Sequence, residues 1–232
     1  MACLGYYLFE DPFLLNTRDD LFLFICKGTV PSVIIMINVV NKLAENPEIF
    51  IILRKLIESN FTGEKNVLKN ELSNINADSR ILDLGCGTGE FSVFFQGFDY
   101  TGIDIESNYI DYAKKNYDGQ FELMDASHML FEDNTFDIIV VFGVFHHINN
   151  EICLQIFDEM NRVLKKNGRI IIMEDVDVES KLDILGNILR KYDKGNYIRK
   201  KNEYLQLFKQ KFKISNNYRI RSGLVTYEVI II

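Results

Sequence analysis

The segment Ile81–Gly89 has the composition of a nucleoside-binding turn. An apolar run, Ile-Leu-Asp-Leu, leads directly into glycines at positions 85, 87 and 89. Glycines let the backbone turn sharply and let a ligand approach without meeting a Cβ atom. We expect residues 90–96 to form a helix whose first N–H groups point at the ligand. This order is typical of a nucleotide site at the carboxyl edge of a parallel sheet.

Two acids stand at the ends of the next two predicted strands. Asp104 follows Gly85 by nineteen residues, a spacing at which an acid can accept hydrogen bonds from ribose hydroxyls. Asp125 lies twenty-one residues further on, where it can reach an adenine amino group. A glycine turn alone is a common connection, and a lone acid at a strand end often caps a helix. The three features together are far more specific.

The turn departs from the common phosphate-binding patterns. The dinucleotide fingerprint G-x-G-x-x-G requires glycine at position 90, where this chain has Glu90. A carboxylate there would repel a pyrophosphate, which disfavours an NAD-dependent dehydrogenase. The ammonium and sulfonium groups of a methionine moiety would tolerate Asp83 and Glu90. The G-x-x-x-x-G-K-[ST] pattern of phosphate-binding loops does not occur.

Residues Asp83-Leu-Gly-Cys-Gly-Thr-Gly89 resemble the first motif of the class I S-adenosylmethionine-dependent methyltransferases. The resemblance extends over roughly residues 80–232 and implies an enzyme that uses S-adenosylmethionine as its cofactor. It implies that the glycine turn holds the methionine portion, Asp104 the ribose, and Ile105 with Asp125 and Ala126 the adenine. The implied cofactor-binding residues are Asp83, Gly85, Cys86, Gly87, Gly89, Asp104, Ile105, Asp125, Ala126 and Gly143.

Two histidines follow the predicted strand Phe136–Phe142, whose end faces the reacting methyl group in this family. Methyl transfer is an in-line displacement in which alignment supplies much of the acceleration. A base is needed only if the acceptor must first lose a proton. His146 or His147 could deprotonate a hydroxyl or orient the acceptor, and we favour His147 slightly as the catalytic residue. Alternatively, one histidine caps the next helix or packs beneath it. No metal site is predicted.

The residues after this strand also bear on the methyl acceptor. The family's DNA-adenine and glutamine-modifying members carry a Pro-Pro-Tyr-type element here. This chain has Gly143-Val-Phe-His146 instead. The resemblance is therefore closer to the branch that methylates small molecules.

The elements that must position these residues alternate between strand and helix from Arg80 onward. Apolar runs predict strands, and helical spacing of apolar residues separates most of them. Strands joined by helices form a parallel sheet covered on both faces. Two final runs joined by a short link predict an antiparallel hairpin. We therefore expect an α/β, Rossmann-like, seven-stranded sheet, mostly parallel with the last strand antiparallel. The predicted strands are 80–84, 100–104, 120–124, 136–142, 168–174, 212–218 and 224–232, and the predicted helices among them are 108–116 and 151–165.

Residues 1–78 lack this alternation, and we expect them to form an N-terminal helical cap before a methyltransferase domain over 79–232. Helical spacing is clear in Glu48–Ser59 and in Asn66–Ile75. The apolar run Leu21–Val40 is interrupted by Lys27, Gly28 and Pro31, so we expect two short buried helical pieces rather than a membrane span. The apolar cap could bind an apolar acceptor or simply pack on the core.

Composition indicates an ordinary cytoplasmic protein. Of the 232 residues, 47% are hydrophobic and 25% are charged, a globular balance. The first cation is Arg18, so a basic signal-peptide region is absent. The four cysteines have neither disulfide-framework nor zinc-ligand spacing, which predicts reduced thiols.

The charge distribution leaves the class of acceptor open. The net charge of −7 disfavours nonspecific nucleic-acid binding by the whole chain. Residues 190–221, however, contain eleven Lys or Arg residues and two acids. This basic segment could meet an anionic small molecule, a membrane surface or RNA, or could be a solvated surface. A small-molecule methyltransferase is the leading interpretation. The alternatives are an RNA or protein methyltransferase and a noncatalytic S-adenosylmethionine-binding module.

Overall fold

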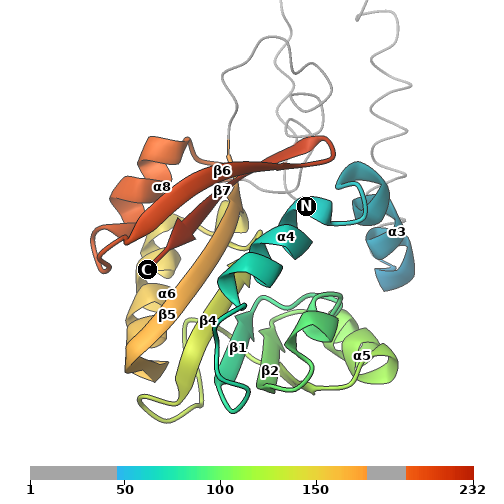
Figure 1. Cartoon of the computed structure of the whole chain (residues 1–232), viewed down its shortest axis with the longest axis horizontal. Coiled ribbons are helices and arrows are strands. Elements are labelled where there is room, and N and C mark those ends of the chain that lie inside the picture. The colour runs from blue at the N-terminus through green and yellow to red at the C-terminus, as the bar shows by residue number, and fades with distance from the viewer. Residues whose placement is uncertain (1–45, 177–196) are drawn as a thin grey trace, which may run out of the picture. The chain divides into compact units, whose positions relative to one another are not determined.

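A seven-stranded sheet forms the centre of the computed structural model, which describes residues 46–176 and 197–232 (Figure 1). The strand order is β3-β2-β1-β4-β5-β7-β6. Strands β1 to β5 are parallel, and β7 runs antiparallel to both of its neighbours. The Rossmann-like prediction with a reversed last strand is confirmed. The strands are β1 (Arg80–Leu84), β2 (Asp99–Asp104), β3 (Gln120–Leu123), β4 (Phe136–Phe142), β5 (Leu164–Asp175), β6 (Asn216–Ser222) and β7 (Val225–Ile231).

The central strands are buried because their side chains are apolar on both faces. In β4, every residue except Asp137 is buried. β4 lies between β1 and β5, as its near-continuous apolar run predicted. The first hairpin strand begins at Asn216 rather than at the predicted Phe212, because the Phe212 ring packs against Phe157 in the core, with centroids 5.4 Å apart.

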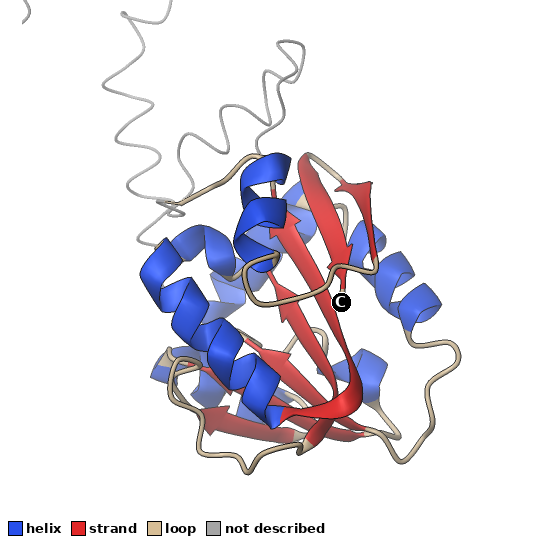
Figure 2. Ribbon diagram, turned by 90° about the vertical axis from the view of Figure 1, so that its left-hand side faces the viewer, coloured by secondary structure: helices blue, strands red, loops and turns tan. Residues whose placement is uncertain are grey.

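Helices cover both faces of the sheet (Figure 2). On one face, α6 and α8 bury residues such as Phe157, Met160 and Phe208. On the other face, α4 and α5 bury Leu68 and Ile110. Fully burying one such side chain contributes about 1.5–3 kcal/mol, so each helix is held mainly by its apolar face. The helices are α3 (Pro47–Ile57), α4 (Thr62–Glu71), α5 (Ser107–Asn116), α6 (Asn150–Val163) and α8 (Lys201–Phe208).

The predicted helix over residues 90–96 is wrong. The chain forms only a short 3-10 helix there, Ser92–Phe95. Gly89 and Gly97, with φ values of +78° and +95°, bound this segment, and only Ser92–Phe95 within it are helical. The Phe95 ring stacks on Tyr100 with centroids 5.2 Å apart and fixes the end of that turn. The glycine turn therefore lacks the helix dipole that the sequence prediction assigned to it.

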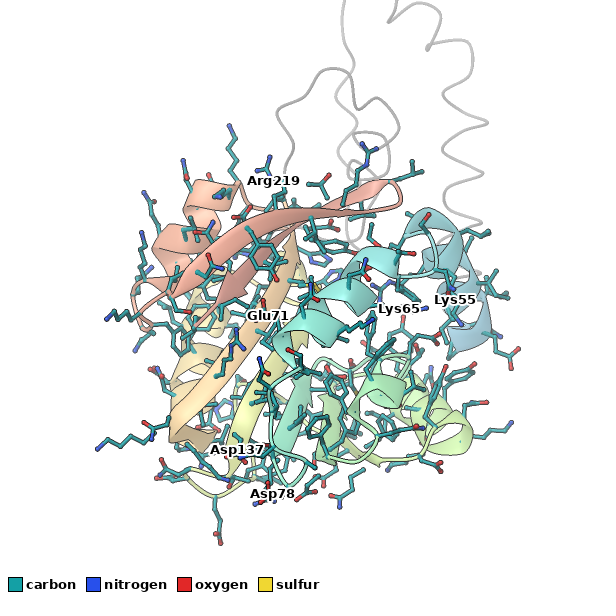
Figure 3. The ribbon with its side chains drawn as sticks, viewed as in Figure 1. Lys55, Lys65, Glu71, Asp78, Asp137 and Arg219 are labelled. Carbon is teal, nitrogen blue, oxygen red and sulfur yellow. The ribbon has the colours of Figure 1, made fainter. Side chains whose placement is uncertain are left out.

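Of the residues that the structure describes before the sheet, α3 and α4 belong to the same compact unit as the sheet, which spans residues 44–232. α4 packs against β6, and Glu71, labelled in Figure 3, lies at the end of α4. Glu71 forms an ion pair with Arg169 of β5 and accepts a hydrogen bond from the Tyr218 hydroxyl of β6. The predicted helical cap over 1–78 and its division from 79–232 stay a prediction, because residues 1–45 lie outside the described part of the chain. The proposed helical pieces in 21–40 lie there too. Within the described ranges, no helix is long and apolar enough to span a membrane.

Candidate active site

A cavity of about 870 Å³ opens where β1, β2 and β4 end. Leu84, Ile103 and Phe142, from the ends of these three strands, line it. This is the carboxyl edge of the parallel sheet, where ligands bind in folds of this architecture. Eight of the residues predicted from the sequence line this one cavity. They are Gly85, Gly87, Asp104, Ile105, Asp125, Ala126, Gly143 and His147.

The glycine turn is pinned to β2 and leaves one face open to the cavity. The N–H groups of Gly85 and Cys86 both donate to the Ile103 carbonyl, at 2.8 and 2.9 Å. A Cβ atom on Gly85 would lie 2.3 Å from the side chain of Val144, so only glycine fits there. A Cβ atom on Gly87 would meet nothing within 4 Å, because this residue faces open space. Gly87 has a φ of +53°, which also favours glycine.

Asp104 joins the glycine turn to the end of β2. Its Oδ2 atom accepts the Gly87 N–H at 2.8 Å, and its Oδ1 atom accepts the Glu106 N–H at 2.9 Å. Burial raises the pKa of this carboxyl, although these backbone hydrogen bonds favour its charged form. An ionised carboxylate has about four acceptor positions, so Asp104 can also accept hydrogen bonds from a ligand.

The predicted adenine-binding residues lie at the next strand end. Ile105 is an apolar side chain that is 67% exposed and lines the cavity, which suits a platform for a planar ring. The Oδ1 atom of Asp125 accepts hydrogen bonds from the N–H and the hydroxyl of Ser127, at 2.8 and 2.7 Å. These two bonds lower the pKa of Asp125, which therefore stays ionised at neutral pH.

Asp83, Cys86 and Gly89 lie outside the cavity lining. Asp83 is 2% exposed beneath the turn and accepts a hydrogen bond from the Tyr100 hydroxyl at 2.9 Å. Burial raises the pKa of Asp83 to about 7. A Cβ atom on Gly89 would lie 2.9 Å from the Cβ of Ala113, so this glycine permits close packing on α5. These residues shape the turn from below rather than from the ligand side.

Glu90 also lies outside the lining and has structural partners. It forms an ion pair with Lys55 of α3 and accepts a hydrogen bond from the Tyr117 hydroxyl at 2.6 Å. The sequence prediction used Glu90 to disfavour a bound pyrophosphate, but this carboxylate does not line the cavity. Through its ion pair with Lys55, Glu90 links α3 to the end of the glycine turn.

The two histidines have different surroundings, although their ring centroids are only 3.9 Å apart. His146 is 6% exposed, and its Nδ1 atom lies 3.1 Å from Oε2 of Glu174. His147 is exposed and lines the cavity. Of the two predicted catalytic residues, only His147 is placed to meet an acceptor directly.

A buried carboxylate that the sequence prediction missed shapes the loop after β4. Glu174, at 0% exposure, accepts the N–H groups of Val144 and Phe145 at 2.8 Å and that of His146 at 3.2 Å. It also lies 3.5 Å from the hydroxyl of Tyr204. The sequence did contain a signal for Glu174, because this acid ends a predicted apolar strand, as Asp104 does.

Arg199 fixes the far side of the same loop. Its guanidinium donates to the carbonyls of Phe145 and Ile148, both at 2.6 Å, and to the Asn150 side chain. A second hollow of about 680 Å³ adjoins Arg199 and α8, away from the glycine turn. Arg199 is 7% exposed and its guanidinium is already used in these hydrogen bonds. We therefore take the 870 Å³ cavity at the glycine turn, rather than this hollow, as the candidate active site.

Further lining residues come from elements that carry no recognisable motif. Arg54 reaches the cavity from α3, and Tyr109 from α5. The side chains of Ile148, Ile152 and Ile156 form an apolar wall near His147. In the described ranges, no group of three or more His, Cys, Asp or Glu residues could hold a metal ion.

Comparison with known families agrees with this geometry. Residues 82–172 match a family described as a methyltransferase domain, and the match contains the end of β1, the glycine turn, Asp104, Asp125, His146 and His147. This similarity to a methyltransferase domain covers less than half of the chain. The matched segment ends within β5, so α3 and the terminal hairpin lie outside it.

Relatives of known sequence match part of this chain. A demethylmenaquinone methyltransferase of Thermotoga maritima is 33% identical over 100 residues, which cover 41% of this chain and 43% of that protein. A demethylmenaquinone methyltransferase of Staphylococcus saprophyticus is 29% identical over 127 residues, covering 50% of this chain and 52% of the relative. The chain thus spans about half, or less, of the curated relatives it matches.

Solved structures share the fold at lower sequence identity. A protein from Pyrococcus horikoshii aligns with a TM-score of 0.59 and 21% identity over 77% of this chain and 94% of that one. A geranyl diphosphate C-methyltransferase from Streptomyces coelicolor aligns with a TM-score of 0.59 and 15% identity over 72% of this chain and 78% of that one. The [4+2]-cyclase SpnF aligns equally well, with a TM-score of 0.59, 17% identity and the same coverages. The fold alone therefore does not set the reaction.

Proposed function

We propose that this protein transfers a methyl group from S-adenosylmethionine to a small-molecule acceptor. The observation that carries the proposal is that one cavity unites Gly85, Gly87, Asp104 and Asp125 with an apolar wall and His147. The two glycines and two acids suit a nucleoside with an amino-acid arm. The apolar wall and His147 suit a methyl acceptor. A match to a methyltransferase domain supports the same conclusion.

The lining residues fit S-adenosylmethionine in size and chemistry. The open space at Gly87 leaves room for the amino-acid arm to approach the backbone. Asp104 is oriented by the turn to receive ribose hydroxyls, and Asp125 is ionised and directed by Ser127 for an amino group. Exposed Ile105 supplies apolar area for the adenine ring. When bound, the cofactor supplies an electrophilic methyl group on a positively charged sulfur.

The protein contributes alignment and, where the acceptor needs it, a proton acceptor. Glu174 and Arg199 fix the loop that carries His147 and so fix the place where an acceptor atom can approach. His147 can take the proton of an acceptor hydroxyl as the new bond to the methyl carbon forms and the carbon–sulfur bond breaks. Most of the acceleration comes from holding the acceptor in line.

The wall made by Ile148, Ile152 and Ile156 favours an acceptor with an apolar body. Two of the relatives are demethylmenaquinone methyltransferases, so a ring with an apolar chain is the first acceptor to test. We place the reaction in the cytoplasm, and the buried, free thiols of Cys86 and Cys153 support this location.

The described part of the basic segment offers less support for an RNA or protein acceptor. Arg199 is buried in the loop after β4. Lys201 pairs with Glu228 at 2.7 Å, and Lys211 pairs with Asp158 at 2.6 Å. These cations have intramolecular partners, and residues 190–196 lie outside the described ranges.

Calorimetric titration with S-adenosylmethionine, and separately with NAD, tests the cofactor. We expect micromolar affinity for the first and no measurable binding of the second. Failure of folded protein to bind S-adenosylmethionine would remove the basis for the proposal.

Formation of S-adenosylhomocysteine then tests the reaction in three parallel assays, with short-chain quinols, RNA or a peptide mixture as the acceptor. The proposal expects product with the quinols, and product loss in His147→Ala with cofactor affinity unchanged. Product with RNA alone, falling steeply with salt, would favour the nucleic-acid alternative. Tight cofactor binding without product in any assay would favour a noncatalytic module.

A further inference from the structure

The second hollow, of about 680 Å³, lies between the start of α6 and α8 and is called the α6–α8 hollow below. Its volume falls within the range of small-molecule sites, about 300–1,000 Å³. Among the described residues, none that lines this hollow also lines the candidate active site. Six polar residues of these two segments line it, namely Asn149, Asn150, Glu151, Glu203, Gln206 and Gln210.

These side chains leave unused hydrogen-bonding groups around the hollow. Within the described ranges, the side chains of Glu151, Gln206 and Gln210 are exposed and form no hydrogen bond or ion pair. The side-chain oxygens of Asn149 and Asn150 accept hydrogen bonds from the protein, at 3.0 and 2.7 Å, which leaves their N–H₂ groups as donors. The lining therefore presents two groups that donate, two amides that donate and accept, and one carboxylate that accepts.

A buried guanidinium in the lining is fully used by the protein. Arg199 has five N–H groups, and five hydrogen bonds to oxygen atoms account for them. Nε and Nη2 donate to the Asn150 side chain at 3.0 and 2.7 Å. The other three bonds go to the carbonyls of Phe145, Tyr197 and Ile148, at 2.6, 3.1 and 2.6 Å. No other described lining residue is a lysine or arginine, so an anion would meet two acids and no available cation. The hollow therefore favours a neutral ligand.

An aromatic residue and an apolar side chain complete the lining. Tyr197 is 42% exposed, and its N–H donates to the His146 carbonyl at 2.9 Å, which fixes this residue to the loop after β4. Leu207 is 3% exposed and belongs to the core on that face of the sheet. A tyrosine ring offers a flat apolar face beside a polar tip. A sugar ring has the matching character, since C–H groups form its faces and hydroxyl groups form its rim.

We propose that the α6–α8 hollow binds a neutral polyhydroxylated ring of the kind found in hexoses. A hydroxyl group both donates and accepts, so neighbouring hydroxyls can pair with the Glu151 carboxylate and with the amides of Gln206 and Gln210. This inference goes beyond the proposed function and does not depend on methyl transfer. One segment, residues 147–152, lines both cavities, so a ring bound in the hollow would contact the segment that carries His147.

Saturation-transfer difference NMR on the full chain tests the proposal, with D-glucose, D-galactose, D-mannose and maltose as probes. We expect a saturable signal with at least one of these sugars. Excess S-adenosylhomocysteine should not displace the sugar, because that compound belongs in the first cavity. D-glucose 6-phosphate should bind no more tightly than D-glucose, since Arg199 has no N–H group left for its phosphate.

The double variant Gln206→Ala/Gln210→Ala removes both unused amides of α8 and should weaken sugar binding by about tenfold or more. Asn202→Ala is the matched control, because Asn202 is an exposed amide of α8 that does not line the hollow. The changed residues are exposed, so both variants should unfold at the same urea concentration as the unaltered protein.

Three results would overturn the proposal. The first is the absence of a saturable signal with all four sugars. The second is unchanged affinity in the double variant, and the third is an equal loss in Asn202→Ala. Displacement of the sugar by S-adenosylhomocysteine, or clearly tighter binding of the 6-phosphate, would contradict it as well. None of these results bears on the proposed methyl transfer, which the titration with S-adenosylmethionine tests separately.

Discussion

At the scale of single residues, Asp104 serves both the turn and the ligand. It holds Gly87 through a backbone hydrogen bond while presenting its remaining lone pairs to the cavity. Replacing Asp104 should therefore lower ligand affinity by more than the loss of its ligand contacts alone, because the turn also loses the hydrogen bond at Gly87. The same carboxylate couples the shape of the glycine turn to the presence of a ribose.

For Asp104→Ala we expect affinity for S-adenosylmethionine to fall by about tenfold to a hundredfold. The reason is the loss of a charged acceptor, worth about 1.5–3 kcal/mol. Calorimetric titration measures it. Asp99→Asn, at the exposed opposite end of β2, is the matched control and should bind normally. Equal affinity in Asp104→Ala and the unaltered protein would refute the ribose role.

Gly87→Ala tests whether the open face of the turn is the ligand face. A Cβ atom there points into the cavity and should lower cofactor affinity by more than about tenfold. Gly97→Ala is the control, because Gly97 also has a positive φ, of +95°, and open space around it, but does not line the cavity. Both variants should lose about 1–3 kcal/mol of stability through backbone strain. Normal binding in both would place the ligand elsewhere.

At the scale of elements, the loop after β4 depends on side chains from elsewhere in the chain. Glu174 holds its N–H groups from one side, and Arg199 holds its carbonyl groups from the other. A loop with such partners is fixed in the absence of ligand, which lowers the entropy lost when an acceptor binds.

Glu174→Gln should lower the free energy of unfolding by at least about 2 kcal/mol. The variant places an amide N–H₂ group where a buried carboxylate accepted three backbone N–H groups. Urea denaturation gives the difference. The control Glu151→Gln changes an exposed acid in the first turn of α6 and should stay within about 0.5 kcal/mol of the unaltered protein. Equal stability of the two variants would contradict the role given to Glu174.

The sequence predicted the elements whose apolar pattern is periodic. β1 and β4 begin and end as predicted, since their runs are bounded by turns and buried on both faces. The helix predicted after the glycine turn is only a 3-10 helix over Ser92–Phe95, where the stacking of Phe95 on Tyr100 of β2 is a contact that the local pattern did not indicate. Likewise, the roles of Glu174 and Arg199 depend on partners distant in sequence, and no local pattern identifies such contacts.

At the scale of the whole molecule, two buried acids join α3 and α4 to the terminal hairpin. Glu58 and Glu64 are 4% and 1% exposed and lie beside Ser222 and Tyr227. Burial, together with the hydrogen bond to Glu58 and the charge of that residue, raises the pKa of Glu64 to about 8. Glu64 is therefore largely protonated at neutral pH in the folded protein.

This protonation predicts how stability changes with pH. The pKa of Glu64 is about 8 when folded and 4.5 as a model value, so the folded state binds the extra proton between these two values. Stability should accordingly fall as the pH rises from 5 to 8, by up to about 1.4 kcal/mol per pH unit.

Glu64→Gln, which mimics the protonated acid, should remove this component. The free energy of unfolding of the variant minus that of the unaltered protein should grow with pH over this range. Glu48→Gln, at an exposed site in α3, should show no such trend. Parallel pH profiles for Glu64→Gln and the unaltered protein would show that Glu64 ionises normally.

The hairpin contact also bears on how the chain is made. The partners of the Glu58 and Glu64 segment are 158 to 169 residues away, in β6 and β7. A ribosome adds about 5–20 residues per second, so these acids wait about 8–30 s for their partners. During synthesis, the contacts of Glu58 and Glu64 with the hairpin must therefore form late, after α3 can already pair with Glu90 through Lys55. A chain stalled before residue 216 would retain the glycine turn yet expose to chaperones the apolar surface that β7 covers in the finished protein.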